Sequence, residues 1–194
     1  MTRSGGFGTH VDDGIAGGNE YFLEKLGQLK AIFLFGSEEK YHFTFTGIGM
    51  TQHDDYSISL SQKTYVEAIE SIQVSRERRK NLKDPVSEQE KTQLRGLSGS
   101  LSYAAVNTRP DIAAKVGEIQ SKTNQAKVED ILIANRTLHE AKTNSSVTIK
   151  ILPIPLSQVR FCLFSDASFA TATRTDQLPE PSSLPPLPSY KPTR

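Results

Sequence analysis

Strand-like and helix-like patterns fall in separate stretches of this chain, and this separation limits the folds that it can adopt. Apolar and polar residues alternate in 41–48 and 56–60, and two further strand-like runs follow at 147–152 and 159–164. Between these regions, residues 87–142 carry apolar side chains at helical spacing. Strands near both ends of the folded part, with helices between them, predict an α+β fold rather than alternating α/β units.

Composition also divides the 194 residues into expected segments. The expected boundaries are a strand-rich region at 1–72, an exposed charged linker at 73–86, a helical region at 87–145, a short strand pair at 146–172 and a tail at 173–194. Six of the ten prolines lie between Pro179 and Pro192, among Ser and Leu residues. A segment of this composition buries too little apolar surface to offset its ordering cost, so we predict that the tail is disordered.

Three helix starts are marked by capping residues. Asn19 is the expected N-cap of a helix that runs to about Phe35, and Ser61 is the expected cap of a helix that continues through Ile72. In the segment 87–90, a Ser is followed three residues later by a Glu, which is the pattern of a capping box. We therefore expect a third helix to begin at this box.

Charge and cysteine content narrow the functional classes. The 23 Lys and Arg residues balance 22 Asp and Glu residues, so the net charge of +1 lacks the basic excess typical of nucleic-acid-binding proteins. The single cysteine, Cys162, excludes an internal disulfide and a cysteine-based zinc cluster. Because the chain shows no long apolar run and no apolar core of a secretion signal in 1–9, we expect an intracellular protein, cytoplasmic or nuclear, that binds no membrane.

Asp12 and Asp13 are the first candidate site residues. They are followed by Gly14 and flanked by Val11 and Ile15, a pattern that indicates a tight turn between two short strands. Magnesium prefers one or two carboxylates together with water and substrate phosphate, and enzymes with two metals use such carboxylates in phosphoryl transfer. The alternative on these residues alone is an ordinary solvated turn.

Two further features carry weaker signals. Asp166 follows the expected strand 159–164 and is either a metal ligand or the cap of the next turn. The basic residues of 76–83 either contact a phosphate backbone or belong to a solvated loop, since Glu77 dilutes their charge.

Five sequence boxes occur in a characteristic order along most of the chain. They are HVDDG at 10–14, FTGI at 45–48, SLSQKTYV at 59–66, LSGSLSYAAVNTRPDIA at 97–113 and FSDAS at 164–168. This set resembles the C-terminal part of the reverse transcriptase of copia-type retrotransposons, in a form similar to that of fungal elements. The first box is similar to the Tyr-Val-Asp-Asp box of reverse transcriptases, and the last resembles the opening strand of the tethered ribonuclease H domain.

The resemblance implies a function for each segment. Residues 1–72 would belong to a polymerase palm, 87–145 to a helical thumb and connection, and 146–172 to the start of a ribonuclease H domain. Asp12 and Asp13 would hold magnesium at the primer terminus, and Asp166 would be one carboxylate of a separate ribonuclease H metal site. The thumb helices would contact an RNA–DNA hybrid or template–primer duplex, chiefly through phosphates and sugars.

Several departures from the family pattern lead to a further expectation. The stretch before the Asp-Asp box is rich in glycine, which weakens a strand. The family's fingers and first catalytic aspartate lie upstream of the box, and the remaining ribonuclease H carboxylates have no counterpart after Asp166. We therefore expect weak or absent magnesium binding and no polymerase activity of this chain alone. One alternative stays open, a non-catalytic nucleic-acid- or protein-binding domain retained from such an element. A third interpretation, an unrelated α+β domain, loses ground because five boxes match in order.

Overall fold

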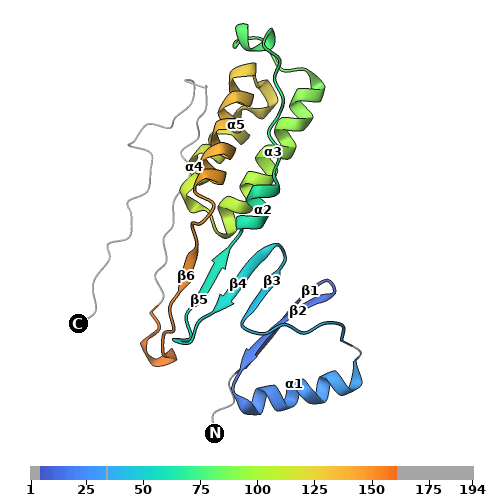
Figure 1. Ribbon diagram of the computed structural model, residues 1–194, viewed down its shortest axis with the longest axis vertical. Helices are drawn as coiled ribbons and strands as arrows, with labels where there is room; N and C mark the ends of the chain where they lie inside the picture. Colours follow the sequence, from blue (N-terminus) through green and yellow to red (C-terminus); the bar gives the residue numbers. More distant parts are fainter. Residues whose placement is uncertain (1–4, 34, 161–194) are drawn as a thin grey trace, which may run out of the picture. The chain divides into compact units, whose positions relative to one another are not determined.

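The computed structural model describes residues 5–33 and 35–160, and it confirms a mixed α+β architecture (Figure 1). The chain divides into two units, 1–154 and 155–194. The described part of the first unit contains two antiparallel sheets and five α-helices, and that of the second contains the short 3-10 helix η4 (Leu156–Gln158). Within the described residues, no helix is long and apolar enough to cross a membrane.

The N-terminal elements are a hairpin and a helix. Strands β1 (Gly5–His10) and β2 (Asp13–Gly18) pair through a two-residue loop, which confirms the tight turn predicted for this segment. Helix α1 (Glu20–Ile32) begins at Asn19, whose side-chain oxygen accepts a hydrogen bond from the Phe22 backbone N–H at 3.1 Å. The N-cap prediction is therefore confirmed, although the helix ends earlier than the sequence indicated.

Strand β1 forms despite its glycines. Two glycines of the hairpin, Gly5 and Gly18, make room for α1. A Cβ atom added to Gly5 would lie 2.2 Å from Cγ of Phe22, and one added to Gly18 would lie 2.6 Å from Cδ1 of the same ring. Gly5 and Gly18 face each other across the hairpin, so the Phe22 ring lies directly on their backbones. The glycine pair thus fixes where α1 packs.

The second sheet has the order β3-β4-β5-β6, and all its neighbours are antiparallel. Its strands are β3 (His42–Phe45), β4 (Ile48–Gln52), β5 (Ile58–Ser61) and β6 (Ile149–Ile151). The prediction of one strand over 41–48 is wrong. Thr46 and Gly47 both adopt positive φ angles, 50° and 77°, and turn the chain back on itself, as in a two-residue hairpin loop.

Strand β6 joins the sheet from a distant part of the sequence. It pairs with β5 through Ile58↔Ile151 and Leu60↔Ile149, so the strand predicted at 147–152 completes the same sheet as β3–β5. Residues 62–148, which contain the helices described below, are consequently inserted between two neighbouring strands. The predicted strand 159–164 lies mostly outside the described residues.

Helix α2 (Lys63–Ala68) is shorter than predicted, because the Asn135 side chain of α5 (Val128–Thr143) forms hydrogen bonds with the backbone that follows α2. The chain becomes extended at Ile69 (φ −67°, ψ 130°). The Ile72 N–H then donates to Oδ1 of Asn135 at 2.9 Å, and Nδ2 of Asn135 donates to the Ile72 carbonyl at 2.7 Å. These two bonds replace those that a longer helix would have made.

Three helices form a bundle that contains most of the core. They are α3 (Glu88–Asn107), α4 (Ala113–Lys122) and α5 (Val128–Thr143), with the 3-10 helices η1 (Arg78–Lys80), η2 (Pro110–Ile112) and η3 (Thr123–Gln125) in the connections. The predicted capping box at Ser87 and Glu90 is present at the start of α3. Leu94, Leu101, Ile112 and Ile131 are fully buried where these helices meet.

Candidate functional site

The tip of the β1–β2 hairpin presents both predicted N-terminal carboxylates. His10 pairs with Asp13, which leaves Val11 and Asp12 as the two loop residues. Val11 has φ 56° and is 90% exposed. A β-branched residue in this conformation is strained, and such strain is found preferentially at functional sites.

Asp12 and Asp13 are both exposed. Within the described residues, neither carboxylate makes a hydrogen bond or an ion pair, and no group of three or more His, Cys, Asp or Glu side chains converges on a common point. An adjacent pair of free carboxylates can supply ligands to magnesium, which retains several waters when it binds to few protein groups. The donor set therefore fits one loosely held ion rather than an enclosed metal site.

One face of the hairpin is open at Gly6 and Gly17, and the Ile15 side chain lies on the same face between these glycines and Asp13. His10 and Asp13 lie on the face opposite the Phe22 contact, because side chains alternate along each strand. On the same face, a Cβ atom added to Gly6 or Gly17 would meet nothing within 4 Å. The backbone there is accessible to a close approach by a ligand.

Asp166, the third predicted site residue, lies outside the described residues. Its assignment to a separate metal site stays a prediction.

Most of the predicted basic cluster is engaged in structural contacts. The Arg78 guanidinium bonds the Glu90 carboxylate at 2.8 and 3.2 Å, and Lys83 bonds Glu129 at 2.9 Å. Hydrogen bonding by Arg78 lowers the pKa of Glu90 to about 2, with help from the Ser87 backbone and hydroxyl groups. The Arg79 Nε–H donates to the Val74 carbonyl at 3.1 Å, so it too is engaged.

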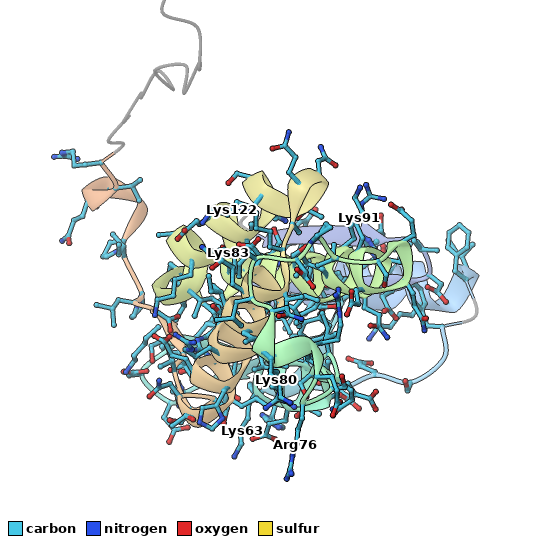
Figure 2. The ribbon with its side chains drawn as sticks, turned by 90° about the horizontal axis from the view of Figure 1, so that it is seen from above. Lys63, Arg76, Lys80, Lys83, Lys91 and Lys122 are labelled. Atoms are coloured by element: carbon cyan, nitrogen blue, oxygen red, sulfur yellow. The ribbon has the colours of Figure 1, made fainter. Side chains whose placement is uncertain are left out.

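The two remaining cations of this cluster are exposed. Within the described part of the chain, Arg76 and Lys80 form no ion pair or hydrogen bond through their side chains. Both belong to the connection that contains η1 (Figure 2). Arg76 and Lys80 are therefore the part of the predicted cluster that is available to a phosphate.

The segment 108–111 contains a buried hydrogen-bond network centred on Arg109, called the Arg109 node below, which was not predicted from the sequence. Arg109 is 1% exposed, and its guanidinium bonds both Asp111 oxygens at 2.9 and 2.7 Å. It also donates to the Ala141 carbonyl in the last turn of α5 at 2.7 Å. The hydrogen bonds and charge of Arg109 hold the pKa of Asp111 below its usual value. The Arg-Pro-Asp spacing was the only available signal of this arrangement.

A second buried contact adjoins this node. The Thr108 hydroxyl donates to Oε1 of Gln62 at 2.8 Å, and both side chains are almost fully buried. Within the described residues, Nε2 of Gln62 has no hydrogen-bond partner. Thr108 and Arg109 thus link α3 to the starts of α2 and η2 and to the end of α5, which gives these two residues of the fourth box an architectural role.

No protein-family model, curated protein or solved structure matches this chain.

Proposed function

We propose that the chain is part of the RNA-directed DNA polymerase of a copia-type retroelement, and that its hairpin carries the polymerase's magnesium-binding Asp-Asp pair. The observation that supports this most directly is the hairpin tip, where Asp12 and Asp13 are exposed, have no ion pair among the described residues and adjoin the strained Val11. The five sequence boxes add to this support. No single box is specific by itself, but the whole set in this order is. In this proposal Asp166 belongs to the separate ribonuclease H metal site.

The burial of the N-terminal elements is consistent with membership of a larger polymerase domain. Strands β1 and β2 and helix α1 contain no buried residue, while Leu23 is 52% and Phe33 59% exposed. Apolar surface of this kind ordinarily marks a contact with other protein. A polymerase palm packs its catalytic hairpin against further sheet and helix, which would cover these side chains.

We also propose that these 194 residues do not polymerise nucleotides by themselves. Two-metal catalysis requires enough ligands to hold both ions about 4 Å apart, and nucleotide transfer requires a pocket that positions the substrate. One adjacent carboxylate pair meets neither requirement. When magnesium is bound, it would neutralise phosphate charge at the hairpin, and the open glycine face would let the nucleic-acid backbone approach.

Primer extension on an RNA template tests this part of the proposal. The purified chain should incorporate no deoxynucleotide above the level of the Asp12→Asn, Asp13→Asn double variant. Magnesium-dependent incorporation that the double variant abolishes would show that the chain is active alone and would refute the proposed inactivity.

The second candidate function is a non-catalytic nucleic-acid-binding domain, and the free cations Arg76 and Lys80 favour it. If the domain holds an RNA–DNA hybrid through phosphates, the binding constant falls as salt rises. Replacing both cations with Ala should weaken binding and reduce the salt slope, whereas Lys115→Ala, which removes a cation already paired with Glu140, should have a smaller effect. Equal effects of the two changes would argue against this function.

A further inference from the structure

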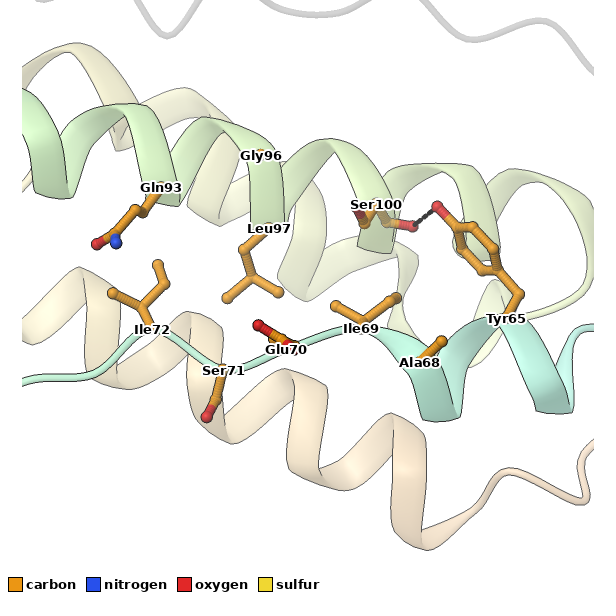
Figure 3. Close-up of a pocket in the computed structure, with 10 residues that line it drawn as sticks. All are labelled: Tyr65, Ala68, Ile69, Glu70, Ser71, Ile72, Gln93, Gly96, Leu97 and Ser100. Carbon is orange, nitrogen blue, oxygen red and sulfur yellow. Dashed lines mark hydrogen bonds between the residues drawn. The ribbon is translucent and has the colours of Figure 1, made fainter.

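A groove lies between helix α3 and the extended segment that follows α2 (Figure 3). Its volume is about 460 Å³, which is within the range of natural ligand sites. One wall is formed by Gln93, Gly96, Leu97 and Ser100 of α3, and the other by Tyr65 of α2 together with residues 68–72. The groove lies in the helical part of the protein, and none of its residues belongs to the Asp-Asp hairpin.

The floor of the groove is apolar, and its α3 wall includes Gly96, which has no side chain. Leu97 is 5% and Ile72 6% exposed, and Ile69 and Tyr65 are half-buried beside them. A Cβ atom added to Gly96 would meet nothing within 4 Å. An apolar side chain of a ligand can therefore enter above Leu97 without displacing protein atoms.

The extended wall offers unpaired backbone groups. Both polar backbone groups of Ile72 are taken by Asn135 of α5. In extended chain, neighbouring residues direct their N–H and C=O groups to the opposite side. The backbone groups of Ser71 and Gln73 make no hydrogen bond within the described part of the chain, so this side is a free edge of the kind to which an added strand binds.

The negative charge of Glu70 favours a ligand with a positively charged side chain. Glu70 lines the groove, and its carboxylate forms no ion pair within the described residues (Figure 3). It is the one side chain that carries a charge at neutral pH among the residues that line the groove. A ligand that places a Lys or Arg beside its apolar side chain would complement this carboxylate.

We propose that this groove binds an extended peptide segment of another protein, with apolar side chains directed at Leu97 and a neighbouring Lys or Arg opposite Glu70. Backbone hydrogen bonds to Ser71 and Gln73 supply affinity, and the apolar floor and the carboxylate supply selectivity. This inference is independent of the proposed polymerase function.

A pooled peptide library tests the proposal by fluorescence anisotropy with the full chain. The probe is the fluorescein-labelled pool Gly-x-Leu-Lys-Val-x-Gly, and the comparison pool carries Glu in place of Lys. The Lys pool should bind at least tenfold more tightly than the Glu pool. Glu70→Lys should reverse this preference, because it reverses the charge at the groove.

Two glycines of α3 provide a matched pair of variants. Gly96 lines the groove and Gly99 does not, yet both are exposed and a Cβ atom on either would meet nothing within 4 Å. Gly96→Leu should weaken binding of the Lys pool at least tenfold by filling the groove, while Gly99→Leu should leave it within twofold. Both variants should retain the helical circular dichroism of the parent chain, because Leu favours helix more than Gly does.

Five outcomes would overturn the proposal. The first three are failure of both pools to bind at millimolar concentration, equal binding of the two pools, and equal effects of the two Leu variants. The fourth is self-association of the chain that Gly96→Leu abolishes, which would assign the groove to a second copy of this chain. Displacement of the Lys pool by an RNA–DNA hybrid, with Gly96→Leu weakening hybrid binding, would likewise assign it to nucleic acid instead of protein.

Discussion

The hydroxyl of Tyr103 in α3 donates a hydrogen bond to the backbone carbonyl of Thr46 in the turn between β3 and β4. The Tyr103 ring also meets the Tyr65 ring edge-on, with centroids 5.2 Å apart. These contacts join the four-stranded sheet to the helical bundle. The third box of the sequence supplies Tyr65, the second supplies Thr46 and the fourth supplies Tyr103, so three boxes meet at this junction.

Tyr103→Phe should therefore destabilise the chain by about 1 kcal/mol, the typical net value of one hydrogen bond. The substitution retains the ring contact and leaves the Thr46 carbonyl without its partner. Urea unfolding measures the change. Tyr56→Phe is the control, since Tyr56 is 74% exposed and its loss of a hydroxyl should change stability by less than about 0.5 kcal/mol. Equal stabilities of the two variants would show that the hydrogen bond contributes nothing.

Arg109→Lys should cost about 3 kcal/mol of unfolding free energy. Lys cannot reproduce the bidentate contact with Asp111 and the bond to the Ala141 carbonyl together, and the site is buried. Thermal and urea unfolding measure this loss. Arg136→Lys, at an exposed position of α5, should leave stability unchanged. A near-neutral Arg109→Lys would contradict the structural role assigned to the node.

Gly18→Ala should disrupt the packing of α1 on the hairpin. Its Cβ atom would lie 2.6 Å from Cδ1 of Phe22 and 2.7 Å from Cα of Gly5, so backbone must move. Gly17→Ala is the matched control, since its Cβ atom would meet nothing within 4 Å. Amide hydrogen exchange of α1 should be faster in the first variant by at least tenfold, corresponding to about 1.4 kcal/mol, and unchanged in the second. Similar exchange in both would contradict the described contact.

The pH dependence of stability should carry the signature of Glu90. Its folded-state pKa of about 2 lies below the ordinary value of 4.5, so its ionised form stabilises the fold above pH 4.5. This contribution, on the order of 2 kcal/mol, is lost as the pH falls from 4.5 toward 2. Glu90→Gln keeps an acceptor for the capping box but removes the charge that pairs with Arg78, so the loss of stability over this pH range should become smaller.

Glu88→Gln provides the control for this titration. Its side chain is 88% exposed and contacts Lys91 only at 3.8 Å. The acid transition of this variant should match that of the parent chain. If Glu88→Gln and Glu90→Gln altered the transition equally, general surface charge rather than the Arg78–Glu90 contact would account for it.

Local sequence signals predicted most of the features that depend on neighbouring residues, although the N-cap of α2 is Gln62 and the prediction of Ser61 is wrong. The cap at Asn19, the capping box at Ser87 and the tight turn before Asp13 all rest on contacts within three residues. The α+β class followed from periodicity along the chain. Features that depend on distant partners were not predicted. Helix α2 stops because of Asn135, which is 63 positions away from Ile72.

The residues of the candidate site also differ in whether their environment depends on neighbouring or on distant residues. The exposed Asp12 and Asp13 were predicted from adjacent residues, whereas the burial of Arg109 depends on the Ala141 carbonyl, 32 positions away. Sequence spacing gave no information on which cations of 76–83 would be neutralised. That outcome depends on Glu90 and Glu129, which belong to two different helices.

The most direct test of the central claim is the effect of Mn²⁺, as a paramagnetic substitute for magnesium, on the amide NMR signals of the chain with and without an RNA–DNA template–primer hybrid. The account predicts broadening centred on residues 11–14, strengthened by the hybrid and removed by Asp12→Asn with Asp13→Asn. Asp54 and Asp55 form another exposed Asp pair at a turn and serve as the internal comparison. Equal broadening at both pairs, unchanged by the hybrid, would contradict the assignment of the hairpin as a polymerase metal site.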